Sequence, residues 1–188
     1  MLKSMYLARE DSFLLLEQVK RHAKGKVLDI GTGSAIQALR AADKKEVSSV
    51  LAVDIDRKVV SELKKIIHTQ KITLNHSDLF SNVHQKFDTI IFNPPYLPRT
   101  EEDCGIKDPA LFGGKEGWEI IEKFFRQASK YLNEGGIILL VFSSFTGKEK
   151  VDEIITENGF NFEELNRQHI FFEDLFVYEV RRRQNPCV

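Results

Sequence analysis

Val27-Leu28-Asp29-Ile30-Gly31-Thr32-Gly33-Ser34 is a short apolar run that ends in a glycine-rich turn. The run predicts a buried strand over 26–30, and the turn leads into a predicted helix over 35–42. Gly31 and Gly33 permit tight backbone conformations and let a ligand approach the backbone with no Cβ in the way. This order of elements indicates a Rossmann-like fold with a ligand at the turn.

Strands and helices continue to alternate on both sides of this turn. Asp11 and Ser12 are predicted to cap a helix that runs to about Ala23. Further strands are expected at 50–54, 71–75, 88–92, 137–142, 160–165 and 175–180, and further helices at 57–68, 116–132 and 148–158. We therefore expect an α/β fold in a single domain over 1–188. Its sheet should have seven strands that are mostly parallel, with the strand at 175–180 running antiparallel. The stretch 97–114 is long for a connection, which favours a functional lid.

Composition narrows the class of protein. With 42% hydrophobic and 29% charged residues, the 188-residue chain is globular. A net charge of -1 disfavours a dedicated nucleic-acid binder. No apolar run approaches the roughly 20 residues of a membrane span, and the two cysteines and five histidines show no metal-ligand spacing. We expect a cytoplasmic protein without a metal site, in which Cys104 and Cys187 are not disulfide-bonded.

Carboxylates follow the first two strands and indicate what the turn binds. Asp29 would repel the pyrophosphate of a dinucleotide but would attract the ammonium group of a methionine moiety, which favours S-adenosylmethionine over NAD. Asp54, at the end of the second strand, can accept hydrogen bonds from two ribose hydroxyls. Asp56 is expected to cap the next helix, a role that Asp54 could also fill.

Ser77-Asp78-Leu79-Phe80 follows the third strand and continues the series. Asp78 could accept a hydrogen bond from the exocyclic amine of adenine, with Leu79 against the ring. Taken alone, this segment would be an ordinary turn.

Asn93-Pro94-Pro95-Tyr96 stands at the carboxyl end of the fourth strand, where ligands bind in open α/β sheets. The two prolines fix a stiff turn, so the Asn93 side-chain oxygen and the Pro94 carbonyl can accept from one NH2 group. Tyr96 offers an aromatic face to a planar group. This arrangement orients a planar nitrogen for methylation and stabilises the positive charge that it gains. Asn-Pro-Pro is also a good turn sequence, which is the structural alternative.

VLDIGTGS, VDID, SDLF and NPPY together resemble the HemK-type glutamine N5-methyltransferases, which modify the Gly-Gly-Gln motif of class I translation release factors. Residues 8–16 and LFGGKEGWEIIEKFF extend the resemblance over nearly the whole chain. It implies a class I S-adenosylmethionine-dependent methyltransferase fold. The residues that it implies as cofactor ligands are Ser12, Asp29, Gly31, Asp54, Asp78 and Asn93, and the turn sequences described above add Gly33 and Leu79 to the predicted cofactor site. The residues that it implies as the glutamine site are Asn93, Pro94, Pro95 and Tyr96.

Two features depart from the bacterial members of that family. The chain has no room for their N-terminal helical domain, and Ala35 replaces the third glycine of the loop found in many methyltransferases. The compact form resembles the archaeal and eukaryotic branch, whose members pair with a small zinc-binding activator subunit. We expect such a subunit to dock on an open sheet edge at 72–75, unless Lys71 and His76 blunt that edge.

Other functions remain open from the sequence. Adenine N6-methyltransferases of DNA or RNA use similar NPPY chemistry, but the basic target-recognition segment typical of them is missing. A protein lysine methyltransferase and a noncatalytic binding module are further alternatives. The predicted reaction is methyl transfer to the glutamine of a class I release factor.

Overall fold

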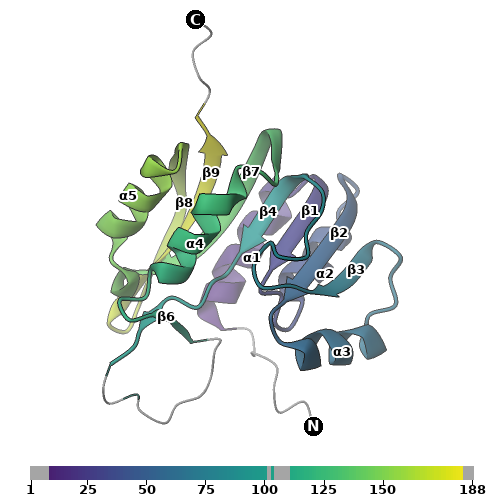
Figure 1. Cartoon of the computed structure of the whole chain (residues 1–188), viewed down its shortest axis with the longest axis horizontal. Coiled ribbons are helices and arrows are strands. Elements are labelled where there is room, and N and C mark those ends of the chain that lie inside the picture. The colour runs from purple at the N-terminus through teal and green to yellow at the C-terminus, as the bar shows by residue number, and fades with distance from the viewer. Residues whose placement is uncertain (1–8, 101–102, 104–110, 184–188) are drawn as a thin grey trace, which may run out of the picture.

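The structure is a computed structural model that describes residues 9–100, 103 and 111–183. Seven of its strands form one sheet in the order β3-β2-β1-β4-β7-β9-β8 (Figure 1). They are β1 (Gly25–Ile30), β2 (Val47–Asp54), β3 (Ile72–His76), β4 (Phe87–Phe92), β7 (Leu132–Ser143), β8 (Phe160–Ile170) and β9 (Glu173–Arg182). The predicted seven-stranded α/β fold is thus confirmed, and β3 is the edge strand on one side, as expected.

One strand, β9, runs against the others. It pairs antiparallel with β7 and with β8, whereas the pairs among β1, β2, β3, β4 and β7 are parallel. β9 lies second from the edge, and β8 forms the edge itself. Because β8 runs in the same direction as β7, the turn between β8 and β9 lies at the carboxyl end of the parallel strands. We call this the carboxyl end of the sheet.

Helices cover both faces of the sheet. One face is covered by α1 (Glu10–His22), α2 (Ile36–Ala42) and α3 (Arg57–Ile66). The other face is covered by α4 (Glu119–Ala128) and α5 (Lys148–Glu157), which stand in front of the sheet in Figure 1. The buried cluster beneath α1, α2 and α3 contains alanine, valine, leucine and isoleucine, and no aromatic side chain among the described residues. The cluster beneath α4 and α5 contains Phe80, Phe87, Phe92, Phe124, Phe125, Phe142, Phe160, Phe176 and Tyr178.

The central strands are mostly apolar because both of their faces are covered. Successive residues alternate between the two clusters: Val27 and Ile91 pack beneath α1 to α3, whereas Leu28 and Ile90 pack on the aromatic side. Asp29 interrupts this pattern near the end of β1 and is also buried. The break in the apolar pattern therefore marks a polar position inside the sheet.

The first helix begins earlier than predicted. It starts at Glu10 after Arg9, so Asp11 and Ser12 lie in its first turn and do not cap it. Both side chains are buried, with 3% and 2% of their surface exposed. The predicted cap was wrong because both side chains contact Asn93, 81 or 82 residues later in the chain.

The helix predicted at 116–132 is shorter, and the strand predicted at 137–142 is longer. β7 already begins at Leu132, which pairs with Phe87, and resumes regular pairing between Ile137 and Thr89. The intervening segment with its two glycines is an irregularity within the strand, not a turn before it. The side-chain amide of Asn133 donates to Asp88 Oδ1 at 2.8 Å and fixes this irregular segment to β4.

The stretch 97–114 contains two short strands, β5 (Leu97–Pro98) and β6 (Phe112–Gly114), which pair in parallel. Most of the predicted lid between them lies outside the described residues, as do both cysteines.

Candidate active site

The glycine turn takes the conformation that its sequence predicts. Gly31 and Gly33 have positive φ angles of 68° and 51°. Ala35, which was predicted to begin the next helix, is instead left-handed with a φ of 60°, and α2 begins one residue later. The Thr32 amide donates to the Val53 carbonyl at 2.9 Å and joins the turn to β2. Among the residues that the structure describes, a Cβ added to Gly31 would meet only the Asn93 carbonyl oxygen, at 4.0 Å. The space above Gly31 therefore opens toward the NPPY segment and can admit a ligand.

Asp29 is a buried acid beneath this turn. Its Oδ2 accepts a hydrogen bond from Thr32 Oγ1 at 2.6 Å. Burial raises the pKa of Asp29 to about 7, and the Thr32 hydrogen bond only partly opposes that rise. A cationic group bound nearby would favour the ionised carboxylate and so lower its pKa. The site is suited to a ligand that carries positive charge.

Asp54 connects the end of β2 to the glycine turn. Its Oδ2 accepts from the Gly33 amide at 2.9 Å, and its Oδ1 accepts from the Asp56 amide at 2.9 Å. Burial is the main cause that raises the pKa of Asp54. The cap of α3 is Asp56, whose Oδ1 accepts from the Lys58 amide at 2.7 Å, as predicted. Since each carboxylate oxygen has a second lone pair, Asp54 can still accept from a ribose diol.

The NPPY segment extends from β4 and is held by α1. Asn93 Nδ2 lies 3.2 Å from Ser12 Oγ and 3.4 Å from Asp11 Oδ2. The Tyr96 hydroxyl donates to the same Asp11 oxygen at 3.2 Å. Because α1 engages the nitrogen of the Asn93 amide, the side-chain oxygen is the group that remains to accept from a substrate.

Two residues of this arrangement were missed by the sequence reasoning. Asp11 was assigned only to a helix cap, yet it contacts both Asn93 and Tyr96. Gln37 on α2 donates to the Ser12 carbonyl at 2.8 Å, and its buried Oε1 has no hydrogen-bond partner in the part of the chain that the structure describes. The one sequence signal was an acid and a hydroxyl directly before an apolar helical run.

The turn after β3 stands beside Asp54. The Ser77 amide donates to the Asp54 carbonyl at 2.9 Å, which places Asp78 and Leu79 at the carboxyl end of the sheet. The Asp78 side chain is exposed, and Leu79 has a φ of 45° and packs partly against the aromatic cluster. The structure thus brings all of the proposed site residues to one end of the sheet, and their contacts with cofactor and substrate stay predictions.

Two kinds of feature are absent from the described ranges 9–100, 103 and 111–183. No helix there is long and apolar enough to cross a membrane. No group of three or more histidine, cysteine, aspartate or glutamate side chains there could hold a metal ion.

The family model and the known proteins that this chain is similar to are methyltransferases. Residues 10–172 match the model of the methyltransferase small domain family. A Methanocaldococcus jannaschii protein, whose name gives protein N5-glutamine methyltransferase as its expected activity, is 35% identical over 95% of this chain and 92% of its own length. A Streptococcus pneumoniae release factor glutamine methyltransferase is 36% identical over 61% of this chain, which spans only 44% of that relative.

Among solved structures, a chain of the E. cuniculi Mtq2–Trm112 complex has the same fold. Its TM-score is 0.73 at 23% identity, over 96% of this chain and 99% of that one. That complex methylates the translation termination factor eRF1.

Proposed function

The chain belongs to the methyltransferase small domain family, and from this premise we propose that it methylates the glutamine of a Gly-Gly-Gln motif in a class I release factor. It is an S-adenosylmethionine-dependent methyltransferase, and its proposed acceptor is the side-chain amide nitrogen of that glutamine. The sheet draws its strands from residue 25 through residue 182, which supports a single catalytic domain over 1–188. Translation termination would place this reaction in the cytoplasm.

The observation that carries the proposal is the fixed orientation of Asn93. Asp11 and Ser12 engage its side-chain nitrogen, so its oxygen is directed to accept from another donor. A primary amide presents an NH2 group, and the Asn93 oxygen and the Pro94 carbonyl can accept both of its hydrogens. An acceptor pair of this kind fits a planar NH2 group better than the tetrahedral ammonium of lysine.

The cofactor fits the other half of the site. Asp54 would accept from the ribose hydroxyls, and Asp29 would lie near the ammonium group of the methionine moiety. Gly31 and Gly33 leave room for close approach, as the open space above Gly31 indicates. Ser12, Asp78 and Leu79 complete the proposed cofactor contacts. The buried acid at Asp29, whose pKa burial raises to about 7 despite the Thr32 hydrogen bond, is the feature of this structure that a cationic cofactor would complement.

The protein's own groups act on the substrate amide. S-Adenosylmethionine supplies a methyl group on a cationic sulfur, so the new nitrogen–carbon bond forms as the sulfur–carbon bond breaks. Asn93 and Pro94 hold the nitrogen in line with that methyl group and stabilise the positive charge that develops on it. Tyr96 packs beside the planar amide. The nitrogen then loses a proton, for which no strong base is needed because alkylation raises its acidity.

An open edge supports a partner subunit. β3 is the edge strand. Two isoleucines at the ends of the neighbouring α3 are each 57% exposed: Ile55, which precedes the helix, and Ile66, its last residue. Lys71 does not cover this edge, because its Nζ donates to the Ala42 and Lys44 carbonyls at 3.0 and 2.9 Å. We propose that a small zinc-binding subunit adds a strand here. The likeness to a chain of the Mtq2–Trm112 complex supports a partner subunit. Its binding would stabilise the enzyme by mass action.

Tritiated S-adenosylmethionine tests the reaction. The protein, with and without the small zinc-binding subunit, is incubated with purified release factor, with the same factor carrying alanine for the motif glutamine, and with duplex DNA. We expect label only on the unaltered factor. Label on DNA adenine, or equal label on both forms of the factor, would overturn the proposed acceptor.

A further inference from the structure

Two phenylalanines protrude from the turn between β8 and β9. Phe171 and Phe172 are 89% and 90% exposed, far above the buried phenylalanines of the core. Phe171 also has a φ of 46°, in the left-handed region that glycine or asparagine ordinarily occupies in a two-residue hairpin turn. Neither packing nor backbone preference therefore accounts for an aromatic pair here. A rigid exposed aromatic pair is typical of a binding anchor.

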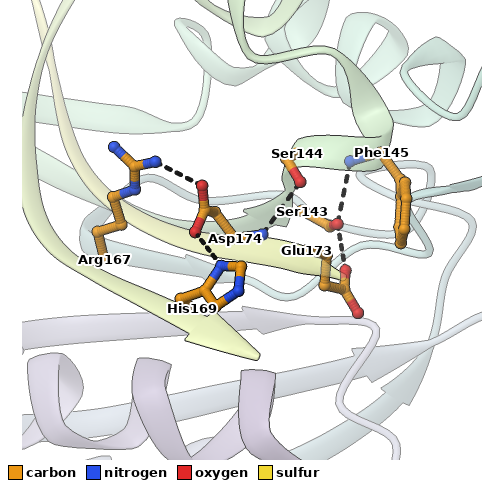
Figure 2. Close-up of polar contacts among 7 residues, drawn as sticks. All are labelled: Ser143, Ser144, Phe145, Arg167, His169, Glu173 and Asp174. Atoms are coloured by element: carbon orange, nitrogen blue, oxygen red, sulfur yellow. Dashed lines mark hydrogen bonds and ion pairs between the residues drawn. The ribbon is translucent and has the colours of Figure 1, made fainter. Parts of the chain in front are cut away.

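The turn is held firmly in place, as Figure 2 shows. Glu173 hydrogen-bonds the Ser143 hydroxyl, and the Asp174 amide donates to Ser144 Oγ at 3.0 Å. The Asp174 carboxylate also contacts Arg167 and His169 of β8, which holds the pKa of that carboxyl below its usual range. The protruding rings therefore stand on a fixed base, and binding through them requires little ordering of the backbone.

This base is connected to the NPPY segment. The short 3-10 helix η2 (Ser144–Thr146) follows β7, and Thr146 Oγ1 donates to the Tyr96 carbonyl at 3.1 Å. Tyr96 and Ile170, which directly precedes the turn, pack against the same apolar cluster. The aromatic pair is thus attached to the same end of the sheet as Asn93. Phe145 on η2 is also exposed, at 49%.

We propose that Phe171 and Phe172 form a docking element for the folded protein that carries the reactive glutamine. This inference rests on the proposed function. A Gly-Gly-Gln motif offers almost no side-chain surface beyond the glutamine itself, so selection of one glutamine requires contacts outside the motif. The aromatic pair lies at the end of the sheet where such a substrate must sit, and it presents apolar surface to it.

The test compares an intact substrate with a minimal one. The variant carries Phe171→Gly and Phe172→Ser, and glycine suits the positive φ at 171, so the fold is expected to survive. Leu39→Ala, which removes another exposed apolar side chain (42% exposed) on α2, is the matched control. Steady-state methylation is measured with purified release factor and with a short Gly-Gly-Gln peptide, with any partner subunit present throughout.

We expect KM for the intact factor to rise about tenfold or more in the double variant, with kcat changed less than about twofold. The peptide should be methylated equally by the double variant, the control and the unaltered protein. Affinity for S-adenosylmethionine and the melting temperature should also be unchanged. If the double variant does not fold, Phe172→Ser alone is tested in the same way.

Three results would overturn the inference. These are an unchanged KM for the intact factor, an equal loss on factor and peptide, or binding of the unaltered protein to lipid vesicles that the double variant loses. A protein that methylates no release factor at all would instead refute the proposed function, which separates the two failures.

Discussion

The two faces of the sheet differ in the side chains that are packed against them. Beneath α1, α2 and α3 the side chains are small and aliphatic, and buried polar residues such as Asp11, Ser12 and Gln37 lie among them. Beneath α4 and α5 the cluster is largely aromatic. Small side chains let α1 approach the strand ends, where Asp11 and Ser12 contact Asn93, while Gln37 of α2 holds the Ser12 carbonyl. The difference suggests that one face supplies the site and the other supplies much of the stability.

Phe124→Ala should have the largest effect, and the effect should fall on stability. The Phe124 ring lies 4.4 Å from the Phe92 ring and 5.0 Å from the Phe125 ring, between centroids. Its removal leaves a cavity in the aromatic face and should cost about 3–5 kcal/mol in free energy of unfolding. Urea denaturation measures this, with Phe172→Ala as the exposed control. If the folded variant bound S-adenosylmethionine much more weakly, the two faces would not be separable.

Asn93→Ala should lower turnover, in contrast to the loss of stability expected for Phe124→Ala. The change removes one preorganised hydrogen-bonding group, so turnover should fall about 10²–10³-fold while the melting temperature is retained. Some loss of cofactor affinity is allowed, because Asn93 is also a proposed cofactor residue. Methylation rates with the release factor measure the effect, and Asn161→Ala on the exposed surface of β8 is the control. Turnover near that of the unaltered protein would remove Asn93 from the mechanism.

Asp54→Ala and Asp56→Ala separate cofactor binding from helix capping. Loss of the Asp54 carboxylate should weaken S-adenosylmethionine binding by about 1–3 kcal/mol. Loss of the Asp56 cap should lower stability by about 0.5–2 kcal/mol and leave affinity nearly unchanged. Calorimetry and thermal unfolding measure the two quantities. The assignment fails if affinity responds to Asp56 and not to Asp54.

The smallest of these effects is expected for cofactor binding, as a change of affinity with pH near neutrality. The pKa of Asp29 is raised to about 7, so about half of these carboxyls are protonated at that pH without cofactor. Binding of a cation favours the ionised form, so affinity should fall by up to tenfold per pH unit below about 7, with release of a proton. Calorimetry in buffers of different ionisation enthalpy would detect that proton.

The Asp29 carboxyl also makes the stability of the fold depend on pH, in a direction that its raised pKa determines. Since the folded pKa of Asp29 lies above its ordinary value of 3.8, the stability that it contributes is present at acid pH and lost as pH rises through about 7. Asp29→Asn should remove this dependence. A stability difference between the two proteins that does not change with pH would contradict the raised pKa.

Local sequence predicted the elements that local chemistry determines. The strand and glycine turn around Gly31 and the cap at Asp56 follow from apolar runs, backbone freedom and short-range hydrogen bonds. These features involve neighbours in the chain, so periodicity and residue type were enough to locate them. The antiparallel strand at 175–180 also followed from its apolar run, though not its position between β7 and β8.

Contacts between distant residues were beyond the sequence reasoning. Asp11 looked like a cap because its partner Asn93 is 82 residues away. The strand was predicted to begin only at residue 137, because the pairing of Leu132 with Phe87 on another strand is not visible locally. The exposure of Phe171 and Phe172 likewise depends on the hairpin between β8 and β9, and no pattern in the sequence singled these residues out.

The position of β9 also has a consequence for synthesis on the ribosome. β1 to β4 and the turns that carry Gly31 and Asp54 are complete once Phe92 has been made, with Asn93 next in the chain. The apolar strand β7 ends at Ser143, but its second neighbour, β9, is finished only at Arg182. At typical elongation rates this gap lasts roughly 2–8 seconds. During that time one edge of the apolar strand β7 lacks its partner, and protection by a chaperone would matter most there.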